Sequence, residues 1–359
     1  MNIITYPEKS TWADLLKRPT LQTESLRETV LEILNRIKFE GDKAVREYEE
    51  KFDKVRLDSL QVSEAEIAEA EKKVSIELKA AITLAYKNIH TFHAAQVFQG
   101  KKITTLPGVT CWQKAVPIEK VGLYIPGGTA PLFSTVLMLA VPARIAGCKE
   151  IVLCTPPGKD GKVHPAILFA AETAGVSKIF KAGGIQAIAA MAYGTESVPK
   201  VYKIFGPGNQ YVTAAKQLVS LKEVAIDMPA GPSEVEVIAD ESANPAFIAA
   251  DFLSQAEHGV DSQAMLVTAS ESIVEPIMQA IREQLDRLPR KEITEKSLSH
   301  SRLIVLKDKQ EVIDFTNLYA PEHLIIQTTD YADIAGQVEN AGSVFMGSYT
   351  PESAGDYAS

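Results

Sequence analysis

The stretch Val121–Cys148, VGLYIPGGTAPLFSTVLMLAVPARIAGC, predicts the fold class of the protein. It begins with a short, mostly apolar run at Val121–Ile125, passes through a glycine turn, and continues into a helix from Pro131 to about Ala146. A strand that leads through a tight turn into a helix is the repeating unit of parallel α/β sheets. We therefore expect a parallel sheet with helices on both faces.

The same alternation continues along the chain, in two blocks on either side of the Pro/Gly-rich link Met228–Pro232. Helices are expected from His164, Ile185 and Asn209, and Thr129 and Asn209 are expected to be helix N-caps. The further predicted strands are Glu150–Thr155, Lys178–Lys181, Lys203–Phe205, Val235–Ile238, Met265–Thr268, Leu303–Leu306, His323–Gln327 and Val344–Met346.

Residues up to about Gln96 have the pattern of charged, amphipathic helices, with apolar residues at helical spacing between Val30 and Ile37. Ser63 and Glu66 have the spacing of a capping box ahead of a long helical run towards Ala95. The apolar stripes are narrow, so these helices are expected to pack on another part of the chain.

Composition narrows the functional classes. A net charge of −9 over 359 residues argues against a surface for DNA or RNA. The longest apolar stretch, Pro131–Ala146, contains Pro142 and Arg144 and is too short to span a membrane. Three cysteines without a C-x-x-C pair argue against a disulfide framework. Because Met1–Ser10 also lacks the pattern of a signal peptide, we expect a cytoplasmic protein.

Three strand-to-helix turns are rich in glycine: Pro126–Thr129, Gly183–Gly184 and Gly206–Asn209. Such turns allow backbone amides to approach a phosphate or ribose, although they also simply satisfy tight connections. The G-x-G-x-x-G fingerprint is absent from all three. Gln186 faces either solvent or a ligand, and Tyr124, at a strand end, is either a core residue or a ligand contact.

Two short segments combine histidine with amide or acidic side chains. Gln255 and His258 are three residues apart on a predicted helix that Gly259 is placed to end. They form either an incomplete metal site or a packing feature. Glu322 and His323 could act as an acid–base pair if their loop departs from strand geometry, in which adjacent side chains point to opposite faces. A third acidic candidate is Glu352 or Asp356.

Together these segments resemble the histidinol dehydrogenase family over essentially the whole chain. The stretches that carry the resemblance are Val121–Cys148, Ile204–Asn209 (IFGPGN), Ile226–Glu234 (IDMPAGPSE), Leu253–Gly259 (LSQAEHG), Ala320–Leu324 (APEHL) and Gly355–Tyr357.

The resemblance implies an enzyme that oxidises L-histidinol through histidinaldehyde to L-histidine, with two NAD⁺ and one zinc ion per site. Mn²⁺ or Co²⁺ would also suit the nitrogen and oxygen ligands. It implies that Glu322 and His323 are the catalytic acid–base pair. The other implied roles are NAD contacts at Tyr124, Gln186 and Asn209, metal ligands at Gln255, His258 and Asp356, and substrate contacts at Ser233, Gln255, His258, His323 and Asp356.

The resemblance also implies two incomplete Rossmann-like parallel-sheet domains, one inserted in the other, with an N-terminal helical segment. The expected division is an arm at 1–20, a first α/β domain at 21–123 plus 235–359, and an inserted domain at 124–234. Family members continue beyond Ser359 with a segment that supplies a histidine metal ligand and a glutamate contact in an intertwined homodimer. We therefore expect a homodimer with a shared site for a longer chain.

Other activities compete with this interpretation. A weakly active or inactive fragment could retain only metal or nucleotide binding, and a metal hydrolase would bind no NAD. Aldehyde oxidation could also proceed through a cysteine thiohemiacetal. Cys111 precedes a predicted turn, whereas Cys148 and Cys154 flank a buried strand. We expect none of the three to be catalytic, because the Glu322–His323 pair offers a route through water.

Overall fold

The computed structural model describes the whole chain except residues 20–25, 129, 230 and 359. It contains two compact units. The first consists of Met1–Thr20 and Ala230–Asp356, and the second of Leu21–Pro229 and Tyr357–Ser359. We call them the split unit and the central unit, and each is described by itself.

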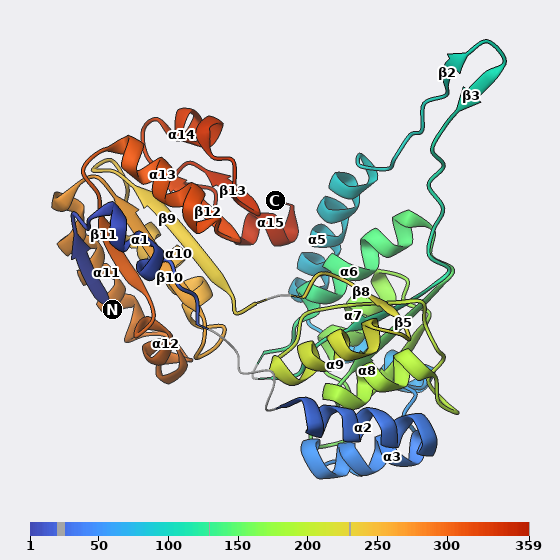
Figure 1. Cartoon of the computed structure of the whole chain (residues 1–359). Helices are drawn as coiled ribbons and strands as arrows, with labels where there is room; N and C mark the ends of the chain where they lie inside the picture. The colour runs from blue at the N-terminus through green and yellow to red at the C-terminus, as the bar shows by residue number, and fades with distance from the viewer. Residues whose placement is uncertain (20–25, 129, 230, 359) are drawn as a thin grey trace. The chain divides into compact units, whose positions relative to one another are not determined.

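The central unit is built on a five-stranded parallel sheet with the order β6-β5-β4-β7-β8 (Figure 1). The chain enters at the middle strand β4, adds two strands on one side and then two on the other, which is the doubly wound dinucleotide-binding order without its sixth strand. The strands are β4 (Lys120–Tyr124), β5 (Glu150–Thr155), β6 (Lys178–Lys181), β7 (Lys203–Phe205) and β8 (Ala225–Ile226). The connecting helices are α6 (Phe133–Ala146), α7 (Pro165–Thr173), α8 (Gly184–Tyr193) and α9 (Gln210–Ser220).

The N-terminal helices add an outer layer to both faces of this sheet. On one face α8 and α9 are covered by α2 (Arg27–Glu40) and α3 (Asp42–Tyr48). On the other face α6 and α7 are covered by α4 (Glu64–Lys73) and α5 (Ile76–Ala94). The predicted capping box is confirmed, with Ser63 and Glu66 bonding reciprocally.

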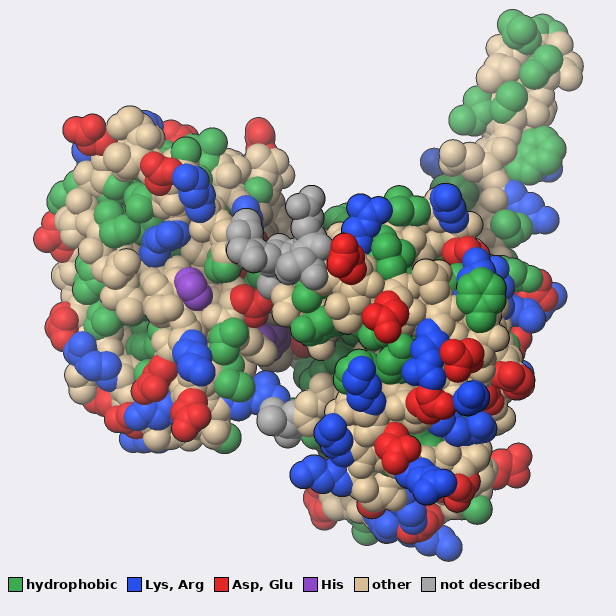
Figure 2. Space-filling view, turned by 60° about the horizontal axis from the view of Figure 1, so that its bottom comes forward, with side chains coloured by type: hydrophobic (Ala, Val, Ile, Leu, Met, Phe, Trp, Pro, Cys, Tyr) green, Lys and Arg blue, Asp and Glu red, His purple; other side chains and the backbone are tan. Residues whose placement is uncertain are grey.

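A two-stranded antiparallel hairpin in the central unit was not predicted. It consists of β2 (Ile103–Leu106) and β3 (Val109–Cys111), and it pairs with neither parallel sheet. Its side chains are exposed, including the apolar Ile103 and Leu106, and Figure 2 shows hydrophobic side chains in green along the projecting arm. A strand is predicted from the alternation of apolar and polar residues that a buried face produces. This hairpin has no buried face, so the pattern is missing.

The split unit is a six-stranded parallel sheet with the order β1-β11-β10-β9-β12-β13. Helices α10 to α12 pack on one face, and α1, α13 and α14 on the other. The strands are β1 (Asn2–Thr5), β9 (Glu234–Ala239), β10 (Gln263–Thr268), β11 (Arg302–Val305), β12 (His323–Gln327) and β13 (Ser343–Met346). The helices are α1 (Trp12–Leu15), α10 (Pro245–Ala256), α11 (Val274–Leu285), α12 (Lys291–Leu298), α13 (Lys309–Tyr319) and α14 (Tyr331–Gln337), and α15 (Ser353–Tyr357) follows.

The compact units divide the chain differently from the predicted domains. Residues 26–123 belong to the central unit, where α2 to α5 bury their apolar stripes on α6 to α9. The predicted arm at 1–20 is part of the split unit: β1 pairs with β11, and Trp12 is buried against Phe315. No helix within the described ranges is long and apolar enough to cross a membrane.

Candidate functional site

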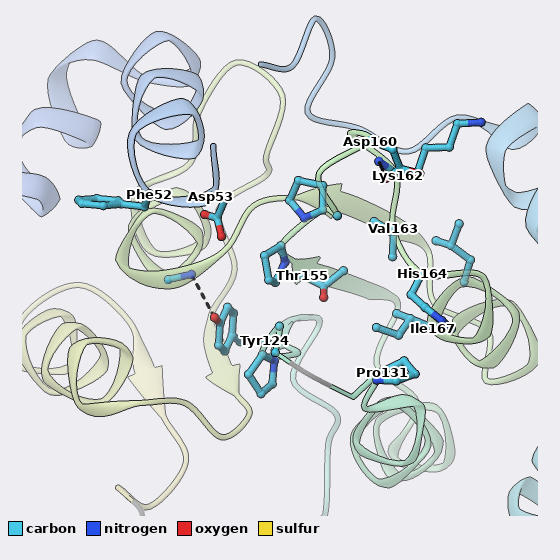
Figure 3. A pocket seen from close by; sticks show the side chains of 18 of the residues that line it. Phe52, Asp53, Tyr124, Pro131, Thr155, Asp160, Lys162, Val163, His164 and Ile167 are labelled. Carbon is cyan, nitrogen blue, oxygen red and sulfur yellow. Dashed lines mark hydrogen bonds between the residues drawn. The ribbon is translucent and has the colours of Figure 1, made fainter. Parts of the chain in front are cut away.

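A cavity of about 910 Å³ opens in the central unit where its strands end, a volume typical of small-molecule and cofactor sites. Tyr124 and Thr155, the last residues of β4 and β5, line it together with Gly184 after β6. The three residues predicted to contact NAD, Tyr124, Gln186 and Asn209, all line this one cavity. Figure 3 shows it with Tyr124 and Asp53 on one side and His164 on another.

Tyr124 is both a core residue and a cavity residue. Its ring is 4% exposed and belongs to the apolar core beneath α8. Its hydroxyl accepts a hydrogen bond from the backbone N–H of Gly184 at 3.0 Å, drawn as the dashed line in Figure 3. Because burial raises the pKa of this phenol, the hydroxyl stays protonated and keeps a proton to donate. The glycine turn and the tyrosine therefore hold each other in place.

Gln186 does not face solvent, because only 1% of it is exposed. Its Nε2 donates to Oε1 of Glu49 at 2.9 Å, and the same oxygen accepts from the backbone N–H of Gly183 at 2.8 Å. Asp53 lies 3.4 Å from Nε2 and also lines the cavity. Burial, with the neighbouring Asp53 charge, raises the pKa of Glu49 to about 7.

Glu49 and Asp53 were not predicted from the sequence. They are the two ends of a π-helical turn, Glu49–Asp53, that follows α3. Such turns are rare and often mark functional sites, but they have no sequence signature of their own. The one available signal was the acidic residues themselves, in a segment predicted to form charged, amphipathic helices.

Asn209 caps helix α9 as predicted, and its Oδ1 accepts from the backbone N–H groups of Tyr211 and Val212 at 3.0 and 3.1 Å. The preceding turn needs glycine: Gly206 has φ +128°, and a Cβ there would lie 2.1 Å from the carbonyl oxygen of Tyr124. Lys216 donates to the carbonyl of Gly206 at 2.7 Å. The turn is therefore held rigidly at the amino end of a helix, where phosphate oxygens are favourably bound.

The predicted start of α6 is wrong. The helix begins at Phe133, so Pro131 lies before it, and Leu132 stands at the cap position without a side-chain hydrogen bond. Thr129, the predicted cap, lies outside the described residues.

The predicted acid–base pair lies at the amino end of β12 in the split unit. His323 is the first residue of the strand and Glu322 precedes it. The loop departs from strand geometry, since Ala320 is left-handed at φ 53° and ψ 63°. Oε2 of Glu322 lies 3.8 Å from Nδ1 of His323, so both side chains reach one site. On the other side of the ring, Nε2 lies 3.6 Å from Oε1 of Glu352.

The hydrogen bonds of His323 determine its neutral tautomer. Nδ1 lies 3.1 Å from the backbone carbonyl oxygen of Glu234. Because a carbonyl can only accept, Nδ1 must carry the proton in that bond. Nε2 of the neutral ring is then the unprotonated nitrogen, and it faces the carboxyl group of Glu352. This arrangement suits a general base that takes a proton at Nε2.

The predicted metal and substrate residues belong to the same unit. Gln255 is 1% exposed near the end of α10, and its Oε1 has no hydrogen-bond partner among the described residues. Nδ1 of His258 is 3.1 Å from Oγ of Ser233. His258 is solvent-accessible, yet desolvation and then Arg290 lower its pKa, with the charge of Asp356 opposing them. A neutral imidazole is the form that binds metal.

The helix end was predicted wrongly. Helix α10 ends at Ala256, and His258 lies in the following turn, where its N–H bonds the carbonyl of Gln255 at 3.1 Å. Gly259 does not have the left-handed conformation expected of a capping glycine. His258 is therefore held by the turn and by Ser233, not by the regular face of a helix.

Both acidic candidates near the carboxyl end of the chain lie close to His323. Burial raises the pKa of Glu352, and the charge of Asp356 raises it further. Burial also raises the pKa of Asp356, opposed by His323 and His258. Within the described residues, no group of three or more His, Cys, Asp or Glu side chains is arranged to hold a metal ion.

A parallel α/β architecture, a cavity at strand ends with helix N-termini behind it, and a histidine–carboxylate cluster together define the class of α/β dehydrogenases. The sequence profile described as histidinol dehydrogenase matches residues 16–359. The chain belongs to the histidinol dehydrogenase family, whose members are NAD-dependent oxidoreductases.

Individual relatives agree with this assignment. The histidinol dehydrogenase of Bacteroides fragilis is 71% identical over 359 residues, all of this chain and 84% of the relative. That of Shigella sonnei is 55% identical over 348 residues, 96% of this chain and 79% of the relative. The crystal structure of histidinol dehydrogenase from Elizabethkingia anophelis superposes with a TM-score of 0.96 at 53% identity, covering 99% of this chain and 82% of that one.

Proposed function

We propose that the protein oxidises L-histidinol through histidinaldehyde to L-histidine and reduces two NAD⁺ in doing so. The observation that carries the proposal is the geometry of His323, with Nδ1 bound to a carbonyl and Nε2 facing a carboxyl group, in a chain of this family. The curated relatives at 71% and 55% identity bear the name of this activity.

In the first oxidation, Nε2 of His323 takes the hydroxyl proton of the substrate while the carbinol carbon gives its hydride to NAD⁺. In the second, Glu322 and His323 remove a proton from a water molecule that adds to the aldehyde carbon. The hydrate then gives its hydride to a second NAD⁺, and the remaining hydroxyl proton leaves as the carboxylate forms. A positioned base contributes about 10²–10⁴-fold to such steps.

Gln255, His258 and Asp356 are the residues that would hold a metal ion, and the unpartnered Oε1 of Gln255 fits this role. An amide oxygen, an imidazole and a carboxylate suit Zn²⁺, and also Mn²⁺ or Co²⁺. When bound, the ion would supply a positive centre that anchors the amine and imidazole of the substrate. Ser233 holds His258 in position and adds a hydroxyl for the substrate.

Tyr124, Gln186 and Asn209 are proposed to contact NAD⁺ in the central cavity. The amino ends of α8 and α9 lie at this cavity, and their partial positive charge would favour the pyrophosphate. The protonated hydroxyl of Tyr124 and the fixed amide of Gln186 offer directional contacts to the ribose or nicotinamide. A homodimer with a shared site and a cytoplasmic location are part of the same proposal.

The test is to count NADH formed per histidinol consumed, with and without added Zn²⁺. Two NADH per histidinol would support the substrate and both oxidations. One NADH, with accumulation of aldehyde, would contradict the second oxidation. No NADH from folded protein that still binds histidinol or Zn²⁺ would contradict the proposal and favour a protein that only binds. Metal binding without any thermal shift by NAD⁺ would favour a hydrolase.

A further inference from the structure

We propose that Arg18, in the N-terminal segment, is a positioning residue for catalysis, acting through Glu234 on Glu322 and His323. This inference rests on the proposed function for its kinetic readout. Its structural readout is independent of turnover.

Arg18 binds Glu234 with two parallel hydrogen bonds. Nε donates to Oε2 at 2.5 Å and Nη2 donates to Oε1 at 2.8 Å. Such a planar fork fixes the orientation of a carboxylate, which the ammonium group of a lysine does not. Glu234 has only 9% of its side chain exposed, so the carboxylate depends on this partner for its charge.

Glu234 in turn binds both members of the acid–base pair. Its Oε1 accepts from the backbone N–H of Glu322 at 3.0 Å. Its backbone carbonyl accepts from Nδ1 of His323 at 3.1 Å. One residue therefore fixes the loop that carries Glu322 and the ring orientation that leaves Nε2 of His323 free.

Arg18 also binds directly to the loop that precedes Glu322. Nη2 donates to the carbonyl oxygens of Tyr319 at 2.7 Å and Ala320 at 3.1 Å, and the guanidinium lies 4.5 Å from the centre of the Tyr319 ring. Ala320 has a left-handed backbone, which a residue with a side chain adopts only when its surroundings hold it there. These contacts supply that constraint two residues before Glu322.

Loss of the guanidinium removes the fork to Glu234 and the contacts to the carbonyls of Tyr319 and Ala320 at once, and leaves Glu234 buried without its charge partner. The loop can then relax, so that the ring of His323 shifts relative to its acceptor, the backbone carbonyl of Glu234 in strand β9. Removing the partner that orients a functional histidine typically lowers activity about 10–100-fold. We therefore expect Arg18→Ala to lower kcat for both oxidations by about 10–100-fold. KM for NAD⁺ should not change, since the residues proposed to bind it belong to the central unit.

The experiment compares Arg18→Ala, Arg18→Lys and Lys9→Ala in the full 359-residue chain. Lys9 is the matched control, because it lies in the same segment and forms an exposed ion pair with Asp314 at 3.2 Å. Arg18→Lys keeps the charge without the fork and preserves folding if Arg18→Ala does not fold. We expect kcat to fall in both Arg18 variants, to stay unchanged in Lys9→Ala, and to recover in Arg18→Ala when ethylguanidinium is added.

A second readout does not need turnover. In protein with ¹⁵N-labelled histidine, the His323 signals, assigned with His323→Asn, should show the Nδ1–H tautomer in the native chain and a mixture in the Arg18 variants. Full kcat and an unchanged tautomer in folded Arg18→Lys would overturn the inference. So would a change confined to KM for NAD⁺. If the native chain forms no NADH, the proposed function fails, and the tautomer measurement still decides the role of Arg18.

Discussion

The two sheets place their functional side chains at opposite ends of their strands. In the central unit, Tyr124 and Asn209 lie where β4 and β7 end, next to the amino ends of helices. In the split unit, His323 lies where β12 begins, Ser233 directly precedes β9, and Gln255 is in the last turn of α10. Parallel α/β sheets usually bind ligands only at the carboxyl ends.

The difference matches the charge of the proposed ligands. Helix N-termini carry partial positive charge and unpaired N–H groups, which suit the phosphates of a dinucleotide. The carboxyl end of α10 carries partial negative charge, and acidic side chains gather near it, which suits an ammonium group or a divalent cation. On the proposed function, one fold type would provide an anion site and a cation site according to which strand end is used.

The largest effect is expected from removing His323, the proposed base of the split unit, and it tests whether the two sheets have the different roles compared above. We expect His323→Asn to lower kcat of both oxidations by about 10²–10⁴-fold and to leave KM for NAD⁺ unchanged. Steady-state rates with histidinol and with histidinaldehyde measure the two steps. His300→Asn, at a position outside both sites, is the control. A rise of KM for NAD⁺ by a similar factor would contradict the assignment of NAD⁺ binding to the residues of the central unit.

Glu322→Gln tests whether Glu322 acts mainly in the second oxidation, whereas His323 acts in both. The amide keeps the shape of the side chain but cannot accept a proton from water. We expect the second oxidation to slow by about 10²-fold and the first to change by less than about threefold. Transient accumulation of histidinaldehyde would report this directly. Equal losses in both steps would show that Glu322 serves both.

Gly206→Ala tests the anion site of the central unit. The added Cβ would lie 2.1 Å from the carbonyl oxygen of Tyr124, at φ +128°. We expect the free energy of unfolding to fall by about 2 kcal/mol and KM for NAD⁺ to rise, because the turn must shift. Gly336→Ala, with open space around it, is the control. Denaturant unfolding and NADH kinetics measure the two effects, and unchanged NAD⁺ kinetics would count against this turn as a phosphate site.

Glu49→Gln tests the buried carboxyl group that binds Gln186 beside the same cavity, through the pH dependence of stability. Its pKa is raised to about 7 in the folded protein, above the ordinary 4.5, so the folded state holds this proton more tightly than the unfolded state. The resulting stability is complete below about pH 4.5 and is lost as the pH rises through 7. Between about pH 4.5 and 7 the native chain should lose about 1.4 kcal/mol per pH unit relative to Glu49→Gln, and above pH 7 the difference should stay constant because both states are then ionised.

Denaturant unfolding at pH 5, 6 and 7 measures this difference, and a further measurement at pH 8 tests the plateau. The exposed neighbour Glu50 supplies the matched control, Glu50→Gln, which should follow the native chain at every pH. A constant difference between Glu49→Gln and the native chain from pH 5 to 7 would mean that Glu49 stays ionised throughout.

The strand bounds and helix caps that depend on neighbouring residues in the chain could be predicted from the sequence. Strands β5 (Glu150–Thr155) and β12 (His323–Gln327) have the predicted bounds, because buried parallel strands are short apolar runs between turns. Asn209 was predicted as a helix cap from residue type alone. The roles of His323 and Glu322 came from the family resemblance and remain predictions.

What the sequence could not predict depends on distant partners. Arg18 and Glu234 are 216 positions apart, and nothing near either residue indicates the pairing. Glu49 reaches Gln186 across 137 positions through a π-helical turn. The first strand, β1 (Asn2–Thr5), joins the sheet at β11, 300 residues later, at an edge where its side chains are mostly exposed. Such contacts follow from tertiary packing, which overrides local preference.

The smallest expected effect is that of Cys111→Ala, and it decides between two chemistries for the second oxidation. A thiohemiacetal route needs a thiol activated by an adjacent base or by a lowered pKa. Cys111 is exposed on β3, where its thiol meets no hydrogen-bond partner among the described residues. Cys148 and Cys154 are buried, and burial raises the pKa of both thiols, which disfavours the thiolate.

We therefore expect Cys111→Ala to oxidise histidinaldehyde at the native rate, measured by NADH formation from the aldehyde. The water route then remains, because it needs only the Glu322–His323 pair. Loss of the aldehyde step in Cys111→Ala, with that step intact in His323→Asn, would transfer the second oxidation from the split unit to a thiol of the central unit. In that case the split unit would keep only the alcohol oxidation, and the comparison between the two strand ends would no longer describe the complete reaction.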